Sequence, residues 1–173
     1  MNKPGSLFLT GPMGAGKTSI GRQLSKRLKR PFHDSDHEIE HRTGVDIPLI
    51  FELEGEAGFR KREVAVIDDL TQLPDIILAT GGGAILDPGN RRHLAERGLV
   101  VYLHTSVDQQ LKRTARDRNR PLLQTADPRA RLEQLMAERE PLYREIADLV
   151  IDTDGKRVQE VVRQICDHLK SIR

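Results

Sequence analysis

Residues 11–18 read GPMGAGKT and fit the pattern G-x-x-x-x-G-K-[ST], which can hold the phosphate groups of a nucleotide. Glycines allow successive backbone N–H groups to point into one concavity, where they bind phosphate oxygens. Lys17 can neutralise the outer phosphates as a point charge, and the Thr18 hydroxyl can coordinate Mg²⁺. A predicted strand precedes this glycine loop and a predicted helix follows it, so a helix N-terminus adds its positive dipole end. This context favours a nucleotide site over a turn without a ligand.

The loop predicts which residues touch the nucleotide, but it does not identify the reaction. The expected contacts are Gly14, Ala15, Gly16, Lys17, Thr18 and Ser19. A GTPase would carry a further base-reading motif of the Asn-Lys-x-Asp type, and the sequence contains none. We therefore expect ATP as the nucleotide.

Two further segments offer groups for chemistry at the ends of predicted strands. Asp34 and Asp36 follow one short apolar stretch, and Gly81–Gly83 follow another. Taken alone, the two acids are more typical of a helix N-cap and a surface acid. Beside a phosphate site, they also suit Mg²⁺ binding and proton transfer. Three successive glycines cost backbone entropy, which favours close approach of a ligand over a simple turn.

Short apolar strands alternate with amphipathic helices along the chain, which predicts an α/β domain with a doubly wound, five-stranded parallel sheet. The expected strands are Ser6–Thr10, Pro31–Asp34, Ile76–Thr80, Leu99–His104 and Leu149–Thr153. Apolar residues at helical spacing predict helices after the glycine loop, over Phe59–Leu73 and over Val158–Ile172. Ligands of such sheets bind outside the carboxyl ends of the strands, where the glycine loop is expected to lie.

The composition of the chain limits the number of domains and the kinds of partner that we expect. A chain of 173 residues, with 37% hydrophobic and 31% charged residues, predicts a single folded domain over residues 1–173. A net charge of +2 and only 3% aromatic residues argue against a nucleic-acid partner. A single Cys excludes an intramolecular disulfide, and the apolar runs are far shorter than the roughly 20 residues that cross a bilayer. With no signal-peptide pattern at the N-terminus, we expect a cytoplasmic monomer with no membrane partner.

Two regions interrupt the alternation of strands and helices. Residues 43–58 contain several glycines and a proline, which predicts a short helix and loop beside the sheet, within a substrate-binding subregion of residues 34–62. Residues 113–124 are dense in charge and include Arg120-Pro121, which disfavours a helix interior. We expect this second region to form a mobile lid over the strand ends.

Six segments in this order resemble the shikimate kinases, small ATP-dependent enzymes of aromatic amino-acid biosynthesis that are related to nucleoside monophosphate kinases. The segments are the glycine loop, 34–36 (DSD), 58–60 (GFR), 81–83 (GGG), 120–123 (RPLL) and 139–143 (REPLY). The resemblance covers nearly the whole chain and implies a P-loop kinase fold. It also implies transfer of the γ-phosphoryl group of ATP to the 3-hydroxyl of shikimate.

The resemblance also implies which residues bind shikimate, the acceptor of the phosphoryl group. It implies that Arg60 and Arg139 bind the shikimate carboxylate, to which a planar guanidinium can bond twice. It implies that Asp36 and Gly82 bind ring hydroxyls, and Asp36 is also the natural acceptor of the proton from the attacking hydroxyl. Arg60 and Glu63 could be an ordinary surface pair, whereas the resemblance implies that Glu63 orients Arg60.

On the nucleotide side, the resemblance implies that Thr18 and Asp34 hold Mg²⁺, Asp34 through a water molecule. Lys17 and Arg120 then join Asp36 as the catalytic residues, with Arg120 stabilising charge on the transferring phosphoryl group. The arginines of the predicted lid could also be a solvated charge run. Arg113 is expected near the adenine. The resemblance places Lys156 in the loop that contacts it.

Other functions remain open at this point. Gluconate is also a polyhydroxy acid, so a gluconate or nucleoside monophosphate kinase of the same architecture is the nearest alternative. A regulatory module that hydrolyses ATP slowly is another. His33, His37 and His41 are spaced by four, but only two share a predicted helix, so we interpret them as surface residues and not as metal ligands. We expect Cys166 to pack in the core.

Overall fold

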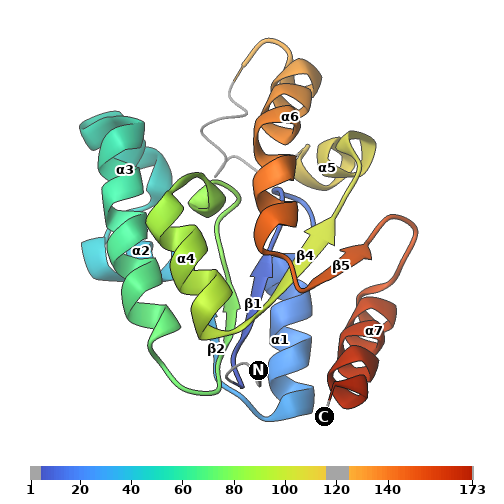
Figure 1. Cartoon of the computed structure of the whole chain (residues 1–173). Coiled ribbons are helices and arrows are strands. Elements are labelled where there is room, and N and C mark those ends of the chain that lie inside the picture. Colours follow the sequence, from blue (N-terminus) through green and yellow to red (C-terminus); the bar gives the residue numbers. More distant parts are fainter. Residues whose placement is uncertain (1–4, 116–124, 173) are drawn as a thin grey trace.

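The computed structural model describes residues 5–115 and 125–172, which fold around one sheet of five parallel strands (Figure 1). The strands are β1 (Leu7–Thr10), β2 (Phe32–Asp34), β3 (Ile77–Ala79), β4 (Leu99–His104) and β5 (Leu149–Asp152), in the order β2-β3-β1-β4-β5. Each predicted strand is present, with ends within one residue of the prediction. The predicted α/β class and parallel sheet are therefore confirmed.

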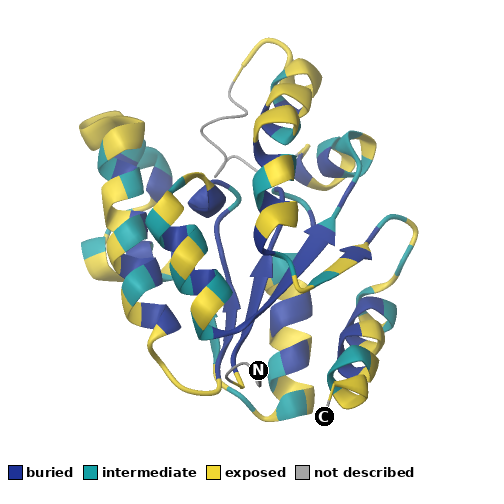
Figure 2. Cartoon of the chain, viewed as in Figure 1, coloured by how far each residue is buried: buried dark blue, intermediate teal, exposed yellow. Residues whose placement is uncertain are grey.

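Helices cover both faces of the sheet (Figure 1). They are α1 (Lys17–Leu28), α2 (Ser35–Thr43), α3 (Ile47–Thr71), α4 (Pro88–Arg97), α5 (Val107–Thr114), α6 (Pro128–Ile146) and α7 (Val158–Ser171), with a 3₁₀ turn, η1 (Ala84–Leu86). The three central strands, β1, β3 and β4, are almost entirely buried between these layers, whereas the edge strands β2 and β5 are partly exposed (Figure 2). Two-sided burial explains why the central strands read as continuous apolar runs rather than alternating ones.

The two faces of the sheet form separate parts of the core. Leu9 and Val101 pack with residues of α1 and α7, including Cys166, which is buried as expected. Phe8 and Leu78 point to the other face and pack with residues of α3, α4 and α6. Neighbouring strand residues thus serve opposite layers, as the pleat of a strand requires.

The sheet topology brings the chemically interesting segments to one edge. β1 lies in the centre, with β3 on one side and β4 on the other, and the glycine loop follows β1 directly. Asp34 ends β2, and Gly81–Gly83 follow β3. Because all strands are parallel, their carboxyl ends lie at the same edge, where ligands bind in such folds.

The prediction for residues 43–58 underestimated their helical content. α3 begins at Ile47, where Asp46 caps it and Pro48 lies in its first turn, a position that tolerates proline. The helix is interrupted at Gly55, whose φ of 72° and ψ of 179° favour glycine. The expected short helix is therefore Ile47 to Glu54, and the expected loop is a single-residue break.

Most of the predicted lid, residues 116–124 with Arg120, lies outside the described part of the chain. Within the described part, Arg113 belongs to the last turn of α5. None of the helices in residues 5–115 and 125–172 combines the length and the apolar character that crossing a membrane requires.

Candidate active site

Positive backbone angles shape the glycine loop. Gly11, Gly14 and Gly16 have φ angles of 144°, 80° and 87°. A Cβ atom on Gly11 would lie 2.5 Å from the carbonyl oxygen of Leu103, and one on Gly14 would lie 3.2 Å from the Cα of Gln110. Glycine is therefore required by conformation and by space at both positions. Gly16 caps α1 without a side-chain hydrogen bond, so the first N–H groups of this helix can serve an anion.

Two cationic side chains lie against the loop. The Lys17 Nζ donates hydrogen bonds to the carbonyl oxygens of Gly11 and Pro12, at 2.7 and 2.8 Å. Arg113 reaches across from α5 and donates to the carbonyl oxygen of Gly14 at 2.8 Å. The structure thus places two positive charges at the loop that is expected to bind phosphates.

The loop forms one wall of a cavity of about 420 Å³. The predicted site residues that line it are Gly14, Gly16, Lys17, Thr18, Ser19, Asp34, Asp36, Gly82 and Arg113. Ala15 is buried behind the loop, so only its backbone can serve a ligand. The cavity therefore joins the predicted phosphate-binding residues to two of the residues predicted to bind shikimate, Asp36 and Gly82.

Asp34 connects the second strand to the glycine loop. One carboxylate oxygen accepts hydrogen bonds from the backbone N–H groups of Asp36 and His37, at 3.0 and 3.2 Å, and so caps α2. The other oxygen accepts from the Thr18 hydroxyl at 2.9 Å. The helix-cap interpretation of Asp34 is thus correct, and it coexists with a contact to Thr18. His37 and His41 are exposed on α2, as interpreted from the sequence.

Each glycine of the triple-glycine segment, Gly81–Gly83, faces a different charged side chain. A Cβ atom on Gly81 would lie 2.7 Å from an Asp36 carboxylate oxygen. On Gly82 it would lie 3.5 Å from Nη1 of Arg139, and on Gly83 it would lie 2.5 Å from Nη1 of Arg60. Larger residues at the first and third positions would displace these charged groups. The segment is thus a thin wall between the cavity and the arginines.

Arg60 and Arg139 contact that wall but do not line the cavity itself. Arg60 forms an ion pair with Glu63 at 2.9 Å, and the Glu63 side chain is only 1% exposed. Burial raises the pKa of Glu63 to about 7, although the Arg60 charge opposes this shift. Arg139 is 4% exposed, and its burial lowers the pKa of the guanidinium. Both arginines are thus held at the edge of the site, where Arg139 is buried and Arg60 remains partly open to solvent.

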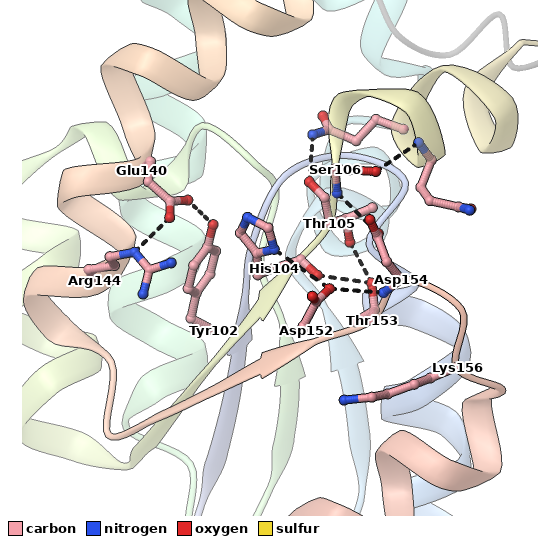
Figure 3. A network of polar contacts seen from close by, with 12 residues as sticks. Tyr102, His104, Thr105, Ser106, Glu140, Arg144, Asp152, Thr153, Asp154 and Lys156 are labelled. Carbon is pink, nitrogen blue, oxygen red and sulfur yellow. Dashed lines mark hydrogen bonds and ion pairs between the residues drawn. The ribbon is translucent and has the colours of Figure 1, made fainter.

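Two tyrosines support this region, and the sequence reasoning assigned no role to either. The Tyr143 hydroxyl donates to the carbonyl oxygen of Gly82 at 2.6 Å, and the Arg139 guanidinium lies beside the same glycine. Its ring stacks on Tyr102, with ring centroids 5.0 Å apart. The Tyr102 hydroxyl in turn bonds to Glu140, which also pairs with Arg144 (Figure 3). A sequence gives no signal for such contacts between distant segments.

The loop after β5 is joined to the loop after β4 (Figure 3). The hydroxyls of Thr105 and Thr153 lie 2.6 Å apart, and the backbone N–H of Ser106 donates to the Asp154 carboxylate at 3.1 Å. Lys156 belongs to this loop, but it does not line the cavity, and its Nζ lies 3.5 Å from the side-chain oxygen of Gln164. The structure thus does not bring Lys156 together with the other predicted nucleotide contacts.

Comparison with known proteins identifies the family. The sequence model of the shikimate kinases matches residues 13–170. This chain belongs to the shikimate kinase family. Shikimate kinase from Thioalkalivibrio sulfidiphilus is 62% identical over 165 residues, which cover 95% of this chain and 87% of that protein.

A solved structure of shikimate kinase from Acinetobacter baumannii in complex with shikimate has a TM-score of 0.96 and 50% identity, covering 99% of this chain and 96% of that one. As a member of the shikimate kinase family, the chain is an ATP-dependent kinase that acts on shikimate. A gluconokinase from Sinorhizobium meliloti matches with a TM-score of 0.62 at 19% identity, covering 99% of this chain and 95% of that one, and so shares only the fold. The family assignment decides against gluconate, a nucleoside monophosphate and a regulatory module.

Proposed function

We propose that ATP binds with its phosphates on the glycine loop while shikimate binds beside the triple-glycine segment, so that the γ-phosphoryl group passes to the 3-hydroxyl across the shared cavity. The products are shikimate 3-phosphate and ADP. The observation that carries this proposal is that Lys17, Thr18, Asp36 and Gly82 line one shared cavity of about 420 Å³. Phosphoryl transfer needs little covalent chemistry from the protein, so positioning and charge stabilisation supply most of the catalysis.

On the acceptor side, Asp36 takes the proton of the attacking 3-hydroxyl, and the backbone of Gly82 binds a ring hydroxyl. Arg60 and Arg139 bind the carboxylate from the edge of the cavity. The planar guanidinium of each, buried for Arg139 and partly buried for Arg60, can bind a carboxylate through two parallel hydrogen bonds. The triple-glycine segment supports this placement, since it allows both arginines to approach the cavity wall.

On the nucleotide side, the backbone N–H groups of Gly14, Ala15, Gly16 and Ser19 bind phosphate oxygens. Lys17 exchanges its contacts with the loop carbonyls for the outer phosphates, and Arg113 lies close enough to the loop to contact the nucleotide. Lys156 reaches the adenine only after leaving Gln164. The role of Arg120 on the transferring phosphoryl group comes from its sequence motif, since that residue lies outside the described part.

Mg²⁺ would be held by Thr18 and Asp34. Their oxygen atoms are hard donors, lie 2.9 Å apart and line the same cavity as the phosphate-binding loop. Within the described part of the chain, no three His, Cys, Asp or Glu residues form a metal cluster. A pair of protein oxygens suits Mg²⁺, which keeps several water ligands and binds phosphates directly. When bound, the ion neutralises charge on the β- and γ-phosphates.

We further propose that the protein acts as a cytoplasmic monomer. The proposed activity is tested by coupled ADP release with ATP and a panel of shikimate, quinate, gluconate and AMP. Of these four acceptors, only shikimate should give rapid turnover of ATP. Equal turnover with gluconate, or ADP release that is insensitive to shikimate, would contradict the proposal.

A further inference from the structure

Two carboxylates hold the Arg60 guanidinium. Its Nη1 pairs with Glu63 at 2.9 Å, and its Nη2 pairs with Glu56 at 3.2 Å. The two acids differ in their surroundings, since the Glu63 side chain is 1% exposed and that of Glu56 is 48% exposed. The pair with Glu63 is therefore a fixed part of the fold, whereas the pair with Glu56 is open to solvent and can exchange.

The position of Glu56 in α3 allows its side chain to release Arg60 at little cost in free energy. It follows Gly55, where the helical backbone of α3 is interrupted, so it begins the second helical segment of α3. A negative charge is favourable in the first turn of a helix, whether or not the side chain is paired. An exposed i,i+4 ion pair contributes little free energy, so Glu56 loses little when it releases Arg60.

Charge balance gives Glu56 a role when the acceptor site holds no ligand. Arg60 and Arg139 both approach the triple-glycine segment, and their positive charges repel each other. The Arg60 charge lowers the pKa of Arg139, and the Glu56 charge raises it. Glu56 therefore supplies negative charge to both arginines from the solvent side. A bound ligand with a carboxylate would supply the same charge.

We propose that Glu56 is a displaceable counter-ion, which occupies Nη2 of Arg60 until the carboxylate of the substrate replaces it. This inference rests on the proposed placement of the shikimate carboxylate at Arg60. Every binding event then includes the loss of one exposed ion pair, and the two carboxylates repel each other while they exchange. Ligands without a carboxylate leave Glu56 in place and gain nothing from Arg60. Glu56 thus lowers the affinity for the substrate while keeping the arginine pair neutralised.

The test is the dissociation constant of shikimate, measured by calorimetry on the full chain without nucleotide. Glu56→Gln removes the charge and keeps the shape of the side chain, so shikimate should bind about two- to fivefold more tightly, the effect expected of one exposed pair. Glu54→Gln is the matched control. Glu54 lies two residues away in α3 and pairs with Arg62 at 2.6 Å, so its substitution should leave the dissociation constant unchanged.

Arg60→Ala separates this inference from the proposed function. If shikimate binds to Arg60→Ala as it binds to the wild type, the carboxylate does not lie at Arg60, and the proposed placement is wrong. If Arg60→Ala binds weakly but Glu56→Gln binds no more tightly than the wild type, only the counter-ion inference is overturned. Weaker binding by Glu56→Gln would show that Glu56 holds Arg60 in position for the ligand instead, which would also overturn it.

Discussion

Tyr143→Phe should weaken shikimate binding, because the Tyr143 hydroxyl holds the carbonyl group of Gly82 in place beside Arg139. The hydroxyl donates to the carbonyl oxygen of Gly82 at 2.6 Å, and the Arg139 guanidinium lies beside this glycine. The tyrosine is 1% exposed and its ring stacks on Tyr102. A phenylalanine ring fills the same space, so the substitution removes the hydroxyl and little else.

The magnitude follows from what the substitution leaves behind. A buried carbonyl that loses its hydrogen-bond donor costs about 1–3 kcal/mol of folding free energy. For a domain of this size each kcal/mol lowers Tm by about 2–4 °C, so Tm should fall by roughly 2–12 °C. The affected groups belong to the acceptor side, so the KM for shikimate should rise about tenfold, the equivalent of about 1.4 kcal/mol. The KM for ATP should stay within about twofold.

Tyr102→Phe is the matched control, measured by the same steady-state kinetics and thermal melting. The Tyr102 hydroxyl bonds to Glu140, and Glu140 is also paired with Arg144 at 2.6 Å, a pair that the substitution leaves in place. In the described part of the chain, no hydrogen bond joins the Tyr102 hydroxyl to Gly82. The control should therefore keep the wild-type KM for shikimate. An unchanged shikimate KM in Tyr143→Phe, or an equal rise in both variants, would refute the reasoning.

The remaining predictions concern the charged groups of the site. Lys17→Met should nearly abolish phosphoryl transfer while circular dichroism shows a folded protein, and near-normal turnover would remove the loop lysine from the mechanism. Asp34→Asn should raise the Mg²⁺ concentration needed for half-maximal activity, and an unchanged Mg²⁺ titration would contradict the metal assignment. Burial raises the pKa of Glu63 from 4.5 to about 7 in the folded protein. Between these two pH values the unfolded chain loses this proton more readily than the folded one, so the stability of the wild type should fall as the pH rises. Glu63→Gln lacks this loss, so its Tm relative to the wild type should increase from pH 5 to pH 8, and a constant difference would refute the raised pKa.

The sheet and the glycine loop could be predicted because their signals are local. All strands but β2 are short and mostly apolar runs, and the loop has a fixed spacing whose glycines at 11, 14 and 16 adopt positive φ angles. The helix from Ile47 was underestimated because its proline and glycines are typical of a loop. In the structure, Pro48 lies in the first turn and Gly55 interrupts the helix for only one residue.

The supporting contacts of the site could not be predicted, because they join residues that are far apart in the sequence. Tyr143 and Gly82 are 61 positions apart, and Arg113 and Gly14 are 99 apart. Which side chain meets which backbone carbonyl depends on how α5 and α6 pack beside the sheet. The separation of Lys156 from the cavity likewise depends on the loop after β5, which hydrogen bonds join to the loop after β4.

We propose that Asp36, which lines the cavity together with Lys17 and Gly82, accepts the proton of the attacking hydroxyl. The most direct test is the kcat of Asp36→Asn at saturating ATP and shikimate, together with its affinity for ATP. Loss of a general base typically lowers turnover about 10²–10⁴-fold, and we expect a loss in this range with ATP binding unchanged. A kcat within about threefold of the wild type would contradict the account, because such a value leaves no role for this carboxylate in the proton transfer.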